Sequence, residues 1–559
     1  MQQREQIFRT IQAKTNVPVL ILGGGINGLG LFRELALQGV DCLLVDKADF
    51  SAGATSKSSR MIHGGLRYLE NREFKLVKEA LLERNRLLEN AGHYVAPLRT
   101  TIPLPSRLGG LLRSMLIFAG IKVRPGERGA VPVKFGLMFY DFITRKNRKT
   151  PTHFLTSKTE ALSKMPGLRR NIVGTATYWD AWITQAERLC IELVRDAQEA
   201  HSGCHALNYV AFEGMKDGAV VLRDQVSGET ATVKPKILIN ATGAWVDRTN
   251  ATLGLKTRFM GGTKGSHLVV DCPALHKALD GQMVYYQYHD GRVCIVFPFL
   301  DKVIMGSTDI RVDDPETATC DEDEMAYMFT TLREVFPEIE IKREHIVFVY
   351  CGVRPLPSSD GVTANISRGH SVRVVPADGD RPFPLYALVG GKWTTFRAFA
   401  EEVADRVLAE IGATRRSRSV EAPIGGGKGF PRKDDEKRAW VERVAKSSGL
   451  SAERLEVLLS RYGTDAERYA DKDETPLTSL PDYSVEEIRR IVKDEYVEHL
   501  SDVVCRRTLI AITGRASKDA LTELADIAGE QLGWDADCRE GEVRETLDLV
   551  RVPGAPQTA

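Results

Sequence analysis

Three closely spaced glycines between two apolar segments constrain the fold of this chain more than any other feature. Residues 17–46 read VPVLILGGGINGLGLFRELALQGVDCLLVD. The apolar run from Val17 to Leu22 predicts a buried strand, and the run from Cys42 to Val45 predicts a second one. Between the two runs, apolar residues at helical spacing predict a helix. A strand, a glycine turn, a helix and a second strand in this order predict a β-α-β unit of a parallel sheet.

The glycines have the spacing of a dinucleotide-binding turn. Gly23 permits the tight turn, Gly25 lets the backbone approach a pyrophosphate, and Gly28 lets the helix pack closely on the strand. Asp46 ends the second strand 18 residues after Gly28, where a carboxylate accepts hydrogen bonds from ribose hydroxyls. A turn without a ligand would explain one glycine, but not three together with the acid. The unit therefore predicts a bound dinucleotide, and it does not distinguish FAD from NAD.

The residues after this unit favour a loop that covers a cofactor. Residues 49–60 read DFSAGATSKSSR, a run of small and hydroxyl-bearing residues with two basic ones. Such a loop exposes many N–H and O–H donors to a long anionic ligand. A plain flexible loop is the alternative interpretation of this segment alone.

Length and composition limit the classes of protein that the chain can belong to. A chain of 559 residues predicts three or four domain-sized units. The net charge of +1 gives no indication of a nucleic-acid partner. Nine cysteines without a C-x-x-C pair are typical of reduced thiols in a cytosolic chain, and no metal site is predicted. Because a signal peptide and an apolar stretch of about 20 residues are both absent, we expect a cytoplasmic protein that does not cross a membrane.

Longer motifs recur along almost the whole chain. In chain order they are DFSAGATSKSSRMIHGGLRYLE (49–70), INATGAWVD (239–247), KGSHLVV (264–270), IMGSTD (304–309), CGVRPL (351–356), ISRGH (366–370), VGGKWTTFR (389–397) and EYVEHLSDVVCRRT (495–508). Through these motifs the chain resembles the FAD-dependent glycerol-3-phosphate dehydrogenases, the aerobic, quinone-linked family of the D-amino-acid-oxidase-like FAD superfamily. The resemblance covers residues 17 to about 540 and implies FAD as the cofactor.

The resemblance implies a set of residues that contact FAD. They are Gly23, Gly25, Asn27, Gly28, Asp46, Ser56, Ser58, Ser59, Arg60, His63, Val210, Ala241, Gly243, Gly391, Thr394 and Thr395. A helix predicted to begin near Thr394 has free N–H groups that suit the anionic N1–O2 edge of a reduced flavin. Two residues depart from the family pattern. The family usually has Glu in place of Asp46, and a smaller apolar residue is common in place of Trp393.

The resemblance also implies the residues of the substrate site. The family oxidises sn-glycerol 3-phosphate, whose dianionic phosphate is best bound by fixed cations. The implied substrate-binding residues are Arg67, Tyr68 and Arg368, and the implied catalytic residues are His267, Arg354 and Lys392. His267 is the first candidate for the proton acceptor, because an ordinary histidine titrates near neutrality. A deprotonated Lys392 and a nearby arginine that acts through water are the weaker candidates. A buried core histidine is the alternative interpretation of His267.

The expected fold class is α/β with α+β features, in three parts. The expected FAD-binding domain is Rossmann-like and discontinuous, from residues 17–100, 160–260 and 345–410. Residues 101–159 and 261–344 are expected to form an antiparallel-sheet domain that faces the substrate and a membrane. Residues 411–437 are the expected linker, and residues 438–549 the expected C-terminal helical domain. Thr184 and Glu187 have the spacing of a capping box before a helix predicted over 184–200.

Residues 101–150 predict a surface that lies on a membrane. They contain ten Lys or Arg residues against two Asp or Glu residues, together with the apolar runs LLRSMLIFAG and FGLMFYDFI. Basic residues beside apolar ones are typical of a surface that binds anionic lipid. Core packing of the apolar runs is the alternative. We expect peripheral association with the inner face of the cytoplasmic membrane.

The function expected from the resemblance is oxidation of sn-glycerol 3-phosphate to dihydroxyacetone phosphate, with FAD as cofactor and a membrane quinone as acceptor. A glycerol-3-phosphate oxidase that uses oxygen is the enzymatic alternative. A non-catalytic FAD-binding protein on a membrane is the alternative from another class. A homodimer is a further possibility that the sequence leaves open.

Overall fold

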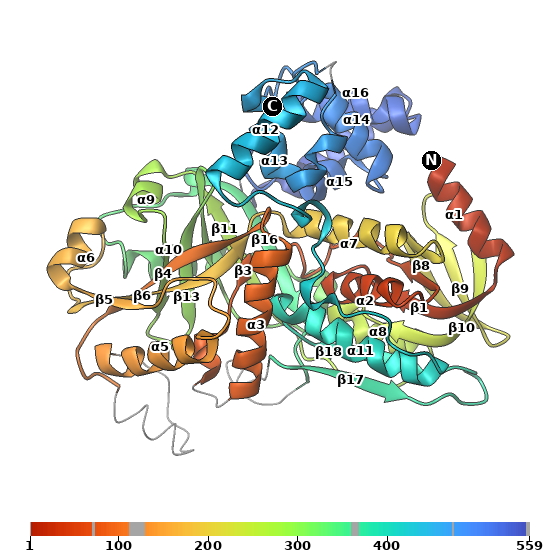
Figure 1. The fold of residues 1–559 in the computed structure, drawn as a ribbon, viewed down its shortest axis with the longest axis horizontal. Helices are drawn as coiled ribbons and strands as arrows, with labels where there is room; N and C mark the ends of the chain where they lie inside the picture. The colour runs from red at the N-terminus through yellow and green to blue at the C-terminus, as the bar shows by residue number, and fades with distance from the viewer. Residues whose placement is uncertain (1, 70–72, 111–128, 359–367, 472–473, 555–559) are drawn as a thin grey trace.

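The computed structural model describes residues 2–69, 73–110, 129–358, 368–471 and 474–554 of the chain, without the side chains of residues 2, 3, 67 and 69. The described residues form two β-sheets and a group of C-terminal helices. In Figure 1 the two sheets lie side by side, and the C-terminal helices lie above them, over α7.

The first sheet has a parallel centre in the strand order β18-β10-β1-β2-β7. These strands are β1 (Asn16–Leu22), β2 (Cys42–Val45), β7 (Cys204–Leu207), β10 (Thr230–Asn240) and β18 (Leu385–Gly390). Antiparallel strands extend it: β17 (His370–Val375) pairs with β18, and β8 (Val210–Lys216) and β9 (Ala219–Asp224) continue from β10. The carboxyl ends of β1, β2, β10 and β18 meet at one edge, where ligands of open α/β sheets bind.

Three helices pack against one another and against the first sheet. They are α2 (Ile26–Leu37), α7 (Ala186–Ala200) and α11 (Phe396–Ile411). Their apolar residues form one buried cluster with the strands, including Leu29, Phe32, Val194 and Val403. A separate cluster contains residues of α1 (Gln2–Ala13), β8, β9 and β10. The central strands are therefore apolar almost throughout, as expected for parallel strands covered on both sides.

The second sheet is mostly antiparallel and has the order β15-β11-β14-β13-β12-β4-β6-β3, with β16 paired to β11 and β5 to β6. Its strands are β3 (Met61–Ile62), β4 (Val95–Leu104), β5 (Phe154–Ser157), β6 (Gly174–Ile183), β11 (Thr263–Val270), β12 (Met283–Gln287), β13 (Val293–Phe299), β14 (Lys302–Gly306), β15 (Ile310–Arg311) and β16 (Ile346–Arg354). One pair, β12 with β4, is parallel. Strand β3 joins this sheet directly after the loop that follows β2, so the chain passes from one sheet to the other beside the expected cofactor site.

In the part of the chain that the structure describes, six further helices are packed around the two sheets. They are α3 (Phe74–Asn90), α5 (Ala130–Thr144), α6 (Lys158–Lys164), α8 (Val246–Thr252), α9 (Pro273–Ala278) and α10 (Glu322–Arg333). Two 3-10 helices matter for the site: η1 (Leu66–Leu69) and η6 (Trp393–Thr395). Among the described residues, every helix is too short or too polar to span a bilayer.

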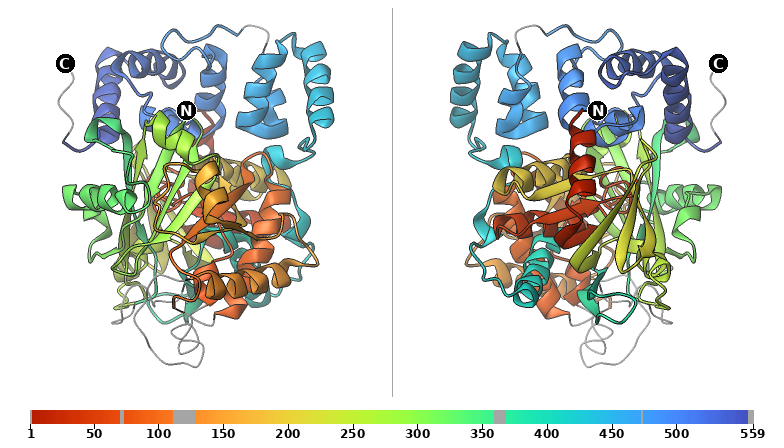
Figure 2. Two further views of the ribbon diagram at one scale, coloured as in Figure 1. Left: turned by 90° about the vertical axis from the view of Figure 1, so that its left-hand side faces the viewer. Right: turned by 90° about the vertical axis from the view of Figure 1, so that its right-hand side faces the viewer.

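The C-terminal part is helical. Its helices are α12 (Asp434–Ser448), α13 (Ala452–Tyr462), α14 (Val485–Asp494), α15 (Leu500–Asp502), α16 (Lys518–Leu532) and α17 (Ala536–Val550). They share a hydrophobic cluster of their own, with Leu458, Ile488 and Leu524 fully buried. Figure 2 shows these helices as a layer that covers one end of the two-sheet body.

The expected fold class is confirmed: a Rossmann-like sheet, a largely antiparallel sheet and a helical C-terminal part are all present. Strands β6 and β16 both belong to the second sheet, where β6 pairs with β4 and β16 pairs with β11. From the sequence, both strands are assigned to the FAD-binding domain. The capping box predicted at Thr184 is wrong. Helix α7 begins at Ala186 after Gln185, and the Thr184 hydroxyl donates to the Tyr94 carbonyl oxygen instead.

Candidate active site

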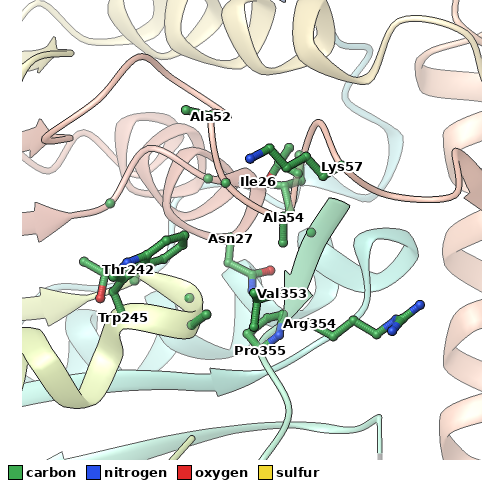
Figure 3. A pocket seen from close by; sticks show the side chains of 18 of the residues that line it. Ile26, Asn27, Ala52, Ala54, Lys57, Thr242, Trp245, Val353, Arg354 and Pro355 are labelled. Carbon is green, nitrogen blue, oxygen red and sulfur yellow. Dashed lines mark hydrogen bonds between the residues drawn. The ribbon is translucent and has the colours of Figure 1, made fainter. Parts of the chain in front are cut away.

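A cavity of about 660 Å³ lies between the two sheets. It is lined by the β1–α2 turn, the loop after β2, the start of α8, the ends of β11 and β16, and the turn before α11. Figure 3 shows Trp245 and Thr242 at one side of this cavity, Asn27 near its middle, and Arg354 extending toward the opposite side. The cavity is therefore elongated and joins segments that are far apart in the sequence.

The glycine turn leaves room for a ligand backbone at one end of the cavity. Gly23 has a φ of +111°, and a Cβ added there would lie 2.7 Å from the Ala241 carbonyl carbon. A Cβ on Gly28 would lie 1.9 Å from the Gly23 carbonyl oxygen. Helix α2 starts at Ile26 without a side-chain cap on Gly25, so its N-terminus faces the cavity as an anion site. The Ile26 N–H donates to the Thr55 hydroxyl at 3.0 Å.

Asp46 lies at the end of β2 with its carboxylate held by backbone amides. Gly24 N donates to Oδ2 at 2.6 Å, and Ala48 N donates to Oδ1 at 2.8 Å. Burial raises the pKa of Asp46 to about 6, although these two hydrogen bonds lower it. Each carboxylate oxygen keeps a lone pair for a further donor. Asp46, whose side chain is shorter than the glutamate usual in the family, thus lies in the cavity wall, where a ribose hydroxyl can reach it.

The turn before α11 forms the opposite side of the cavity. Gly390 and Gly391 have φ values of +76° and +98°, which permit the backbone to turn toward the cavity. The Thr394 hydroxyl accepts from the His63 N–H at 3.2 Å and so ties this turn to residues 61–64. Asn27 Nδ2 donates to the Gly390 carbonyl oxygen at 3.4 Å, whereas Asn27 Oδ1 is buried and has no hydrogen-bond partner in the part of the chain that the structure describes.

These features fit FAD. Gly23 and Gly28 permit the tight turn and the close packing of α2 that a dinucleotide-binding turn requires, because side chains there would collide with the protein backbone, and Gly25 lines the cavity. The start of α2, which has no side-chain cap on Gly25, faces the cavity and suits the phosphates of a long anionic ligand. A buried acceptor without a partner, Asn27 Oδ1, indicates that a ligand donor completes the site.

Arg354 lies at the end of β16 with its guanidinium anchored by the protein. Its Nη1 donates to the Lys264 carbonyl oxygen at 3.1 Å and to Asp309 Oδ1 at 3.2 Å. Its Nη2 donates to Ser307 Oγ at 3.1 Å and to the Thr308 carbonyl oxygen at 3.0 Å. Since both terminal nitrogens are fully engaged, Arg354 supplies a fixed positive charge rather than a free fork for two phosphate oxygens.

His267 lies on β11 in the wall of the cavity and is 2% exposed. Its ring stacks on Tyr350 with centroids 4.9 Å apart, and neither ring nitrogen has a hydrogen-bond partner among the described residues. Burial, together with the charges of Arg354 and Arg60, lowers the pKa of His267 to about 3. The imidazole is therefore neutral at pH 7, and the ordinary titration near neutrality that favoured it as the proton acceptor does not apply here.

Lys392 lies at the start of the turn before α11 and faces the same cavity. Burial lowers the pKa of Lys392 to about 7, while the charge of Asp180 opposes this effect. Its Nζ lies 4.5 Å from the ring centroid of Tyr68 and donates to the His63 carbonyl oxygen at 3.4 Å. A lysine with a pKa near the working pH can both hold and accept a proton.

Most residues assigned from sequence meet in this cavity. The assigned residues that line it are Gly23, Gly25, Asn27, Asp46, Ser58, Ser59, His63, Tyr68, Val210, Ala241, Gly243, His267, Arg354, Gly391, Lys392 and Thr394. Gly28 lies beneath the turn, where it allows the close packing of α2 described above.

Four other assigned residues do not line the cavity. Arg60 is buried in an ion pair with Glu187, with Nη2 and Oε1 2.6 Å apart. Ser56 Oγ donates to the Gly53 carbonyl oxygen, and Thr395 Oγ1 donates to the Lys392 carbonyl oxygen. Arg368 is close enough that its charge lowers the pKa of His63, after burial and Lys392. The side chain of residue 67, assigned to substrate binding, lies outside the described part of the structure.

The sequence interpretation missed several residues that line the cavity. They include Lys57, Phe212, Trp245, Thr249, Thr252 and Glu316. Trp245 Nε1 donates to Glu316 Oε1 at 2.7 Å, and Lys47 pairs with the same oxygen at 2.7 Å. Trp245 follows the Gly243 turn within a motif already singled out, so its position was a usable signal. Glu316 lies in a short 3-10 helix between β15 and α10, and no local sequence pattern indicates that it lines the cavity.

Comparisons with known proteins give a consistent result over nearly the whole chain. Residues 18–406 match the family described as FAD dependent oxidoreductase. Residues 417–539 match the family described as C-terminal domain of alpha-glycerophosphate oxidase.

Curated relatives and a solved structure extend this likeness. The glycerol-3-phosphate dehydrogenase of Synechocystis sp. is 33% identical over 560 residues, which cover 94% of this chain and 95% of the relative. The D-erythritol 1-phosphate dehydrogenase of Brucella abortus is 29% identical over 516 residues, which cover 88% of this chain and 93% of the relative. The structure of a glycerol-3-phosphate dehydrogenase from Bacillus halodurans complexed with FAD has a TM-score of 0.75 at 21% identity and covers 100% of this chain and 99% of that one. This structural likeness supports the fold alone.

Proposed function

The chain belongs to the family of FAD-dependent glycerol-3-phosphate dehydrogenases, and from this premise we propose that it oxidises sn-glycerol 3-phosphate to dihydroxyacetone phosphate with FAD and passes the electrons to a membrane quinone. One observation supports this proposal above the others. One cavity has a glycine cradle that fits FAD and two basic residues, the buried Lys392 and the partly exposed Arg354, in the same wall.

The proposal assigns proton acceptance to Lys392. Oxidation of a secondary alcohol requires a base for the hydroxyl proton, and FAD, when bound, accepts the hydride from carbon 2. A base works best when its pKa lies near the working pH, and the pKa of Lys392 is about 7. His267, with a pKa of about 3, is a much weaker proton acceptor at pH 7. His267 instead forms a neutral, flat part of the wall against Tyr350.

The proposal assigns phosphate binding to the side of the cavity next to η1. Tyr68 lies there beside Lys392, and Arg67 precedes it in the same helix. Arg368 adds positive charge from the segment before β17, since it lowers the pKa of Lys392 and of Arg354 after larger effects of burial and of nearby carboxylates. Arg354 completes the positive field from a fixed position. Several cations around one dianion provide affinity that a single surface arginine does not.

We further propose that α5 lies on an anionic membrane, at the inner face of the cytoplasmic membrane. Its outward side chains Phe135, Met138 and Phe142 are at least half exposed. Lys134 lies among them, and basic residues follow the helix at 145–149. Exposed aromatic residues beside lysine and arginine suit the interface of an anionic bilayer. In Figure 1, α5 lies at the lower left of the molecule, far from the C-terminal helices.

The test of the proposed reaction is anaerobic addition of sn-glycerol 3-phosphate to the FAD-loaded enzyme. Loss of the oxidised flavin absorbance supports the proposal, and an unchanged spectrum contradicts it. A panel that includes D-erythritol 1-phosphate and glycerol without phosphate tests the substrate class. The former is the substrate named for one relative.

The alternative is an oxidase that uses oxygen, and it is favoured by the match of residues 417–539 to the C-terminal domain of alpha-glycerophosphate oxidase. Turnover with a soluble quinone analogue under anaerobic conditions, compared with turnover in oxygen alone, separates the two. Peroxide formation at the full rate of turnover would exclude quinone as the required acceptor.

A further inference from the structure

A buried hydrogen-bond cluster supports the active-site turn between β3 and η1. The Gly64 N–H donates to the Tyr140 hydroxyl at 3.0 Å and to Asp180 Oδ1 at 3.1 Å. The Tyr140 hydroxyl donates to the same Asp180 oxygen at 2.5 Å, and Arg84 Nη1 pairs with it at 3.2 Å. We call Tyr140, Asp180 and Arg84 the support cluster. These three side chains are 3%, 2% and 1% exposed, respectively, and come from α5, β6 and α3.

The turn rests directly on the support cluster because Gly64 has no side chain. A Cβ added to Gly64 would lie 2.4 Å from the Tyr140 hydroxyl oxygen and 2.3 Å from Leu81. Gly65 has a φ of +79°, and a Cβ there would lie 2.1 Å from the Tyr68 ring and 3.1 Å from Lys392 Nζ. A small shift of Gly64 is therefore transmitted to Tyr68 and to the amine of Lys392.

The support cluster also provides the principal negative charge near Lys392. Among the charged groups that act on this lysine, Asp180 opposes the effect of burial most strongly. Glu73 and Glu79, before and within α3, act in the same direction, and Arg368, before β17, acts against them. On the turn itself, the Tyr68 ring and the His63 carbonyl oxygen contact Nζ. Burial raises the pKa of Asp180 itself, and its partner Arg84 opposes this effect.

We propose that Tyr140 and Asp180 are positioning residues for the oxidation, which hold the Gly64 amide and thereby set the place of Tyr68 and Lys392 against the substrate. This inference rests on the proposed function. Tyr140 and Asp180 do not line the cavity, so they act through the turn and not through contact with a ligand.

Tyr140→Phe tests the hydrogen bond to Gly64. The variant removes the hydroxyl and leaves the Asp180 charge, so we expect kcat/KM for sn-glycerol 3-phosphate to fall about three- to tenfold. Flavin content should not change. Tyr178→Phe is the matched control, because Tyr178 is equally buried and its ring lies 5.7 Å from that of Tyr140. In the described structure its hydroxyl makes no hydrogen bond to Gly64. Equal kinetics in the two variants would overturn the inference.

Asp180→Asn tests the charge and has a readout that a purely structural role would not move. Without the carboxylate, the protonated form of Lys392 is less stable, so its pKa falls. We expect the acidic limb of the pH profile of kcat/KM to move to lower pH by about one unit. Tyr140→Phe, which keeps the charge, should leave the limb in place. An unmoved limb in folded Asp180→Asn would overturn the inference.

Phosphate binding separates failure of this inference from failure of the proposed function. Inorganic phosphate is titrated into the oxidised, FAD-loaded enzyme across pH and is followed by the change in flavin absorbance. Binding that depends on the Lys392 ammonium should lose affinity at lower pH in Asp180→Asn than in the wild type. If sn-glycerol 3-phosphate does not reduce the flavin of the wild-type enzyme, the proposed function is contradicted. The comparison of phosphate binding between the wild type and Asp180→Asn can still be made. If Asp180→Asn yields no folded protein, the comparison of Tyr140→Phe with Tyr178→Phe decides.

Discussion

At the scale of single residues, burial determines which side chain in the cavity can accept a proton. His267 and Lys392 both line the cavity, and burial lowers the pKa of each because it disfavours the charged form. The same effect moves histidine away from neutrality and lysine toward it. For His267 the charges of Arg354 and Arg60 add to the effect of burial, whereas for Lys392 the charge of Asp180 opposes it. Residue type alone places a histidine nearest to neutrality, whereas in this cavity burial places the pKa of Lys392 there instead.

Lys392→Met should remove the acidic limb near pH 7 and lower kcat by about 100-fold or more, because general base catalysis contributes about 10²- to 10⁴-fold. The pKa of Lys392 is about 7, so activity of the wild type should fall as the pH falls through this value. The measurement is kcat and kcat/KM from pH 5.5 to 9, with flavin content as the check on folding.

His267→Gln is the comparison for this prediction. The pKa of His267 in the wild type is about 3, so this side chain stays neutral from pH 5.5 to 9. The glutamine variant should therefore keep the fall in activity below pH 7. Proton acceptance would be assigned to His267 if the acidic limb of the pH profile disappeared in His267→Gln and remained in Lys392→Met.

At the scale of elements, two features position the site: close packing of α2 beneath the glycine turn, and the two-sided character of α5. Gly28 lets α2 approach the end of β1, and the Gly23 carbonyl oxygen fills the space that a side chain would need. Helix α5 places Tyr140 against the active-site turn and Phe135 in solvent. One helix thus connects the interior of the site with a surface of the molecule.

Gly28→Ala should destabilise the FAD-binding unit by about 1–3 kcal/mol, because the methyl group would lie against backbone that cannot move freely. Thermal unfolding and flavin content measure the effect. Gly541→Ala is the control, since a Cβ at this position of α17 meets only the end of Arg544 at 4.0 Å. That variant should be neutral or up to about 1 kcal/mol more stable. Equal stability of the two variants would contradict the packing role of Gly28.

The surface of α5 gives a second prediction at this scale. Replacing both Phe135 and Phe142 with Ser should reduce co-sedimentation with phosphatidylglycerol vesicles about tenfold or more, because each buried aromatic side chain contributes about 1.5–3 kcal/mol. Leu549→Ser is the control, as Leu549 is 60% exposed on α17, among the C-terminal helices. Binding to neutral vesicles should be weak in all variants. Unchanged binding by the α5 variant would exclude this face as the membrane contact.

At the scale of the whole molecule, buried ion pairs join the C-terminal helices to the cofactor loop. Arg507 Nη1 lies 2.8 Å from Asp49 Oδ2, and both side chains are fully buried. Arg188 of α7 makes a second pair with Glu495 at 2.8 Å. Asp49 begins the loop that lines the cavity, so the motif at 495–508 anchors the start of this loop. Burial would raise the pKa of Asp49, but Arg507 and Arg506 outweigh it and lower this pKa.

Arg507→Met should destabilise the protein by at most about 3–5 kcal/mol, because it removes one of the two arginines paired with the buried Asp49 carboxylate and leaves Arg506. Flavin content should fall with it, since the loop after Asp49 lines the cavity. Arg489→Met, which removes an exposed pair with Glu530, should change stability by less than about 1 kcal/mol. If Arg507→Met had the same Tm and flavin content as Arg489→Met, the proposed link between the C-terminal helices and the cofactor loop would be contradicted.

The sign of the pH dependence follows from the same ion pair. The folded-state pKa of Asp49 lies below the unfolded value, so its contribution is present at neutral pH. It should be lost as the pH falls below about 4, where the unfolded carboxyl becomes protonated. Unfolding measured from pH 7 down to pH 3 should show this loss in the wild type and a smaller one in Arg507→Met.

Local patterns in the sequence determined the cofactor end of the site. The strands, the glycine turn, the helix and Asp46 are within 30 consecutive residues, and each requirement there is a property of short-range backbone geometry. The fold class and FAD followed from this unit and from the motifs that resemble a known family, and both are confirmed.

Only the tertiary structure decided the chemistry at the other end. Arg60 was assigned to FAD through the family resemblance and Thr184 to a helix cap from its local pattern, but Glu187 and the Tyr94 carbonyl oxygen bind them instead. The pKa values of Lys392 and His267, and the support of Gly64 by Tyr140 and Asp180, depend on segments up to several hundred residues apart. Burial and charge act through space, so a sequence pattern can name the residues of such a site but cannot set their protonation or their partners.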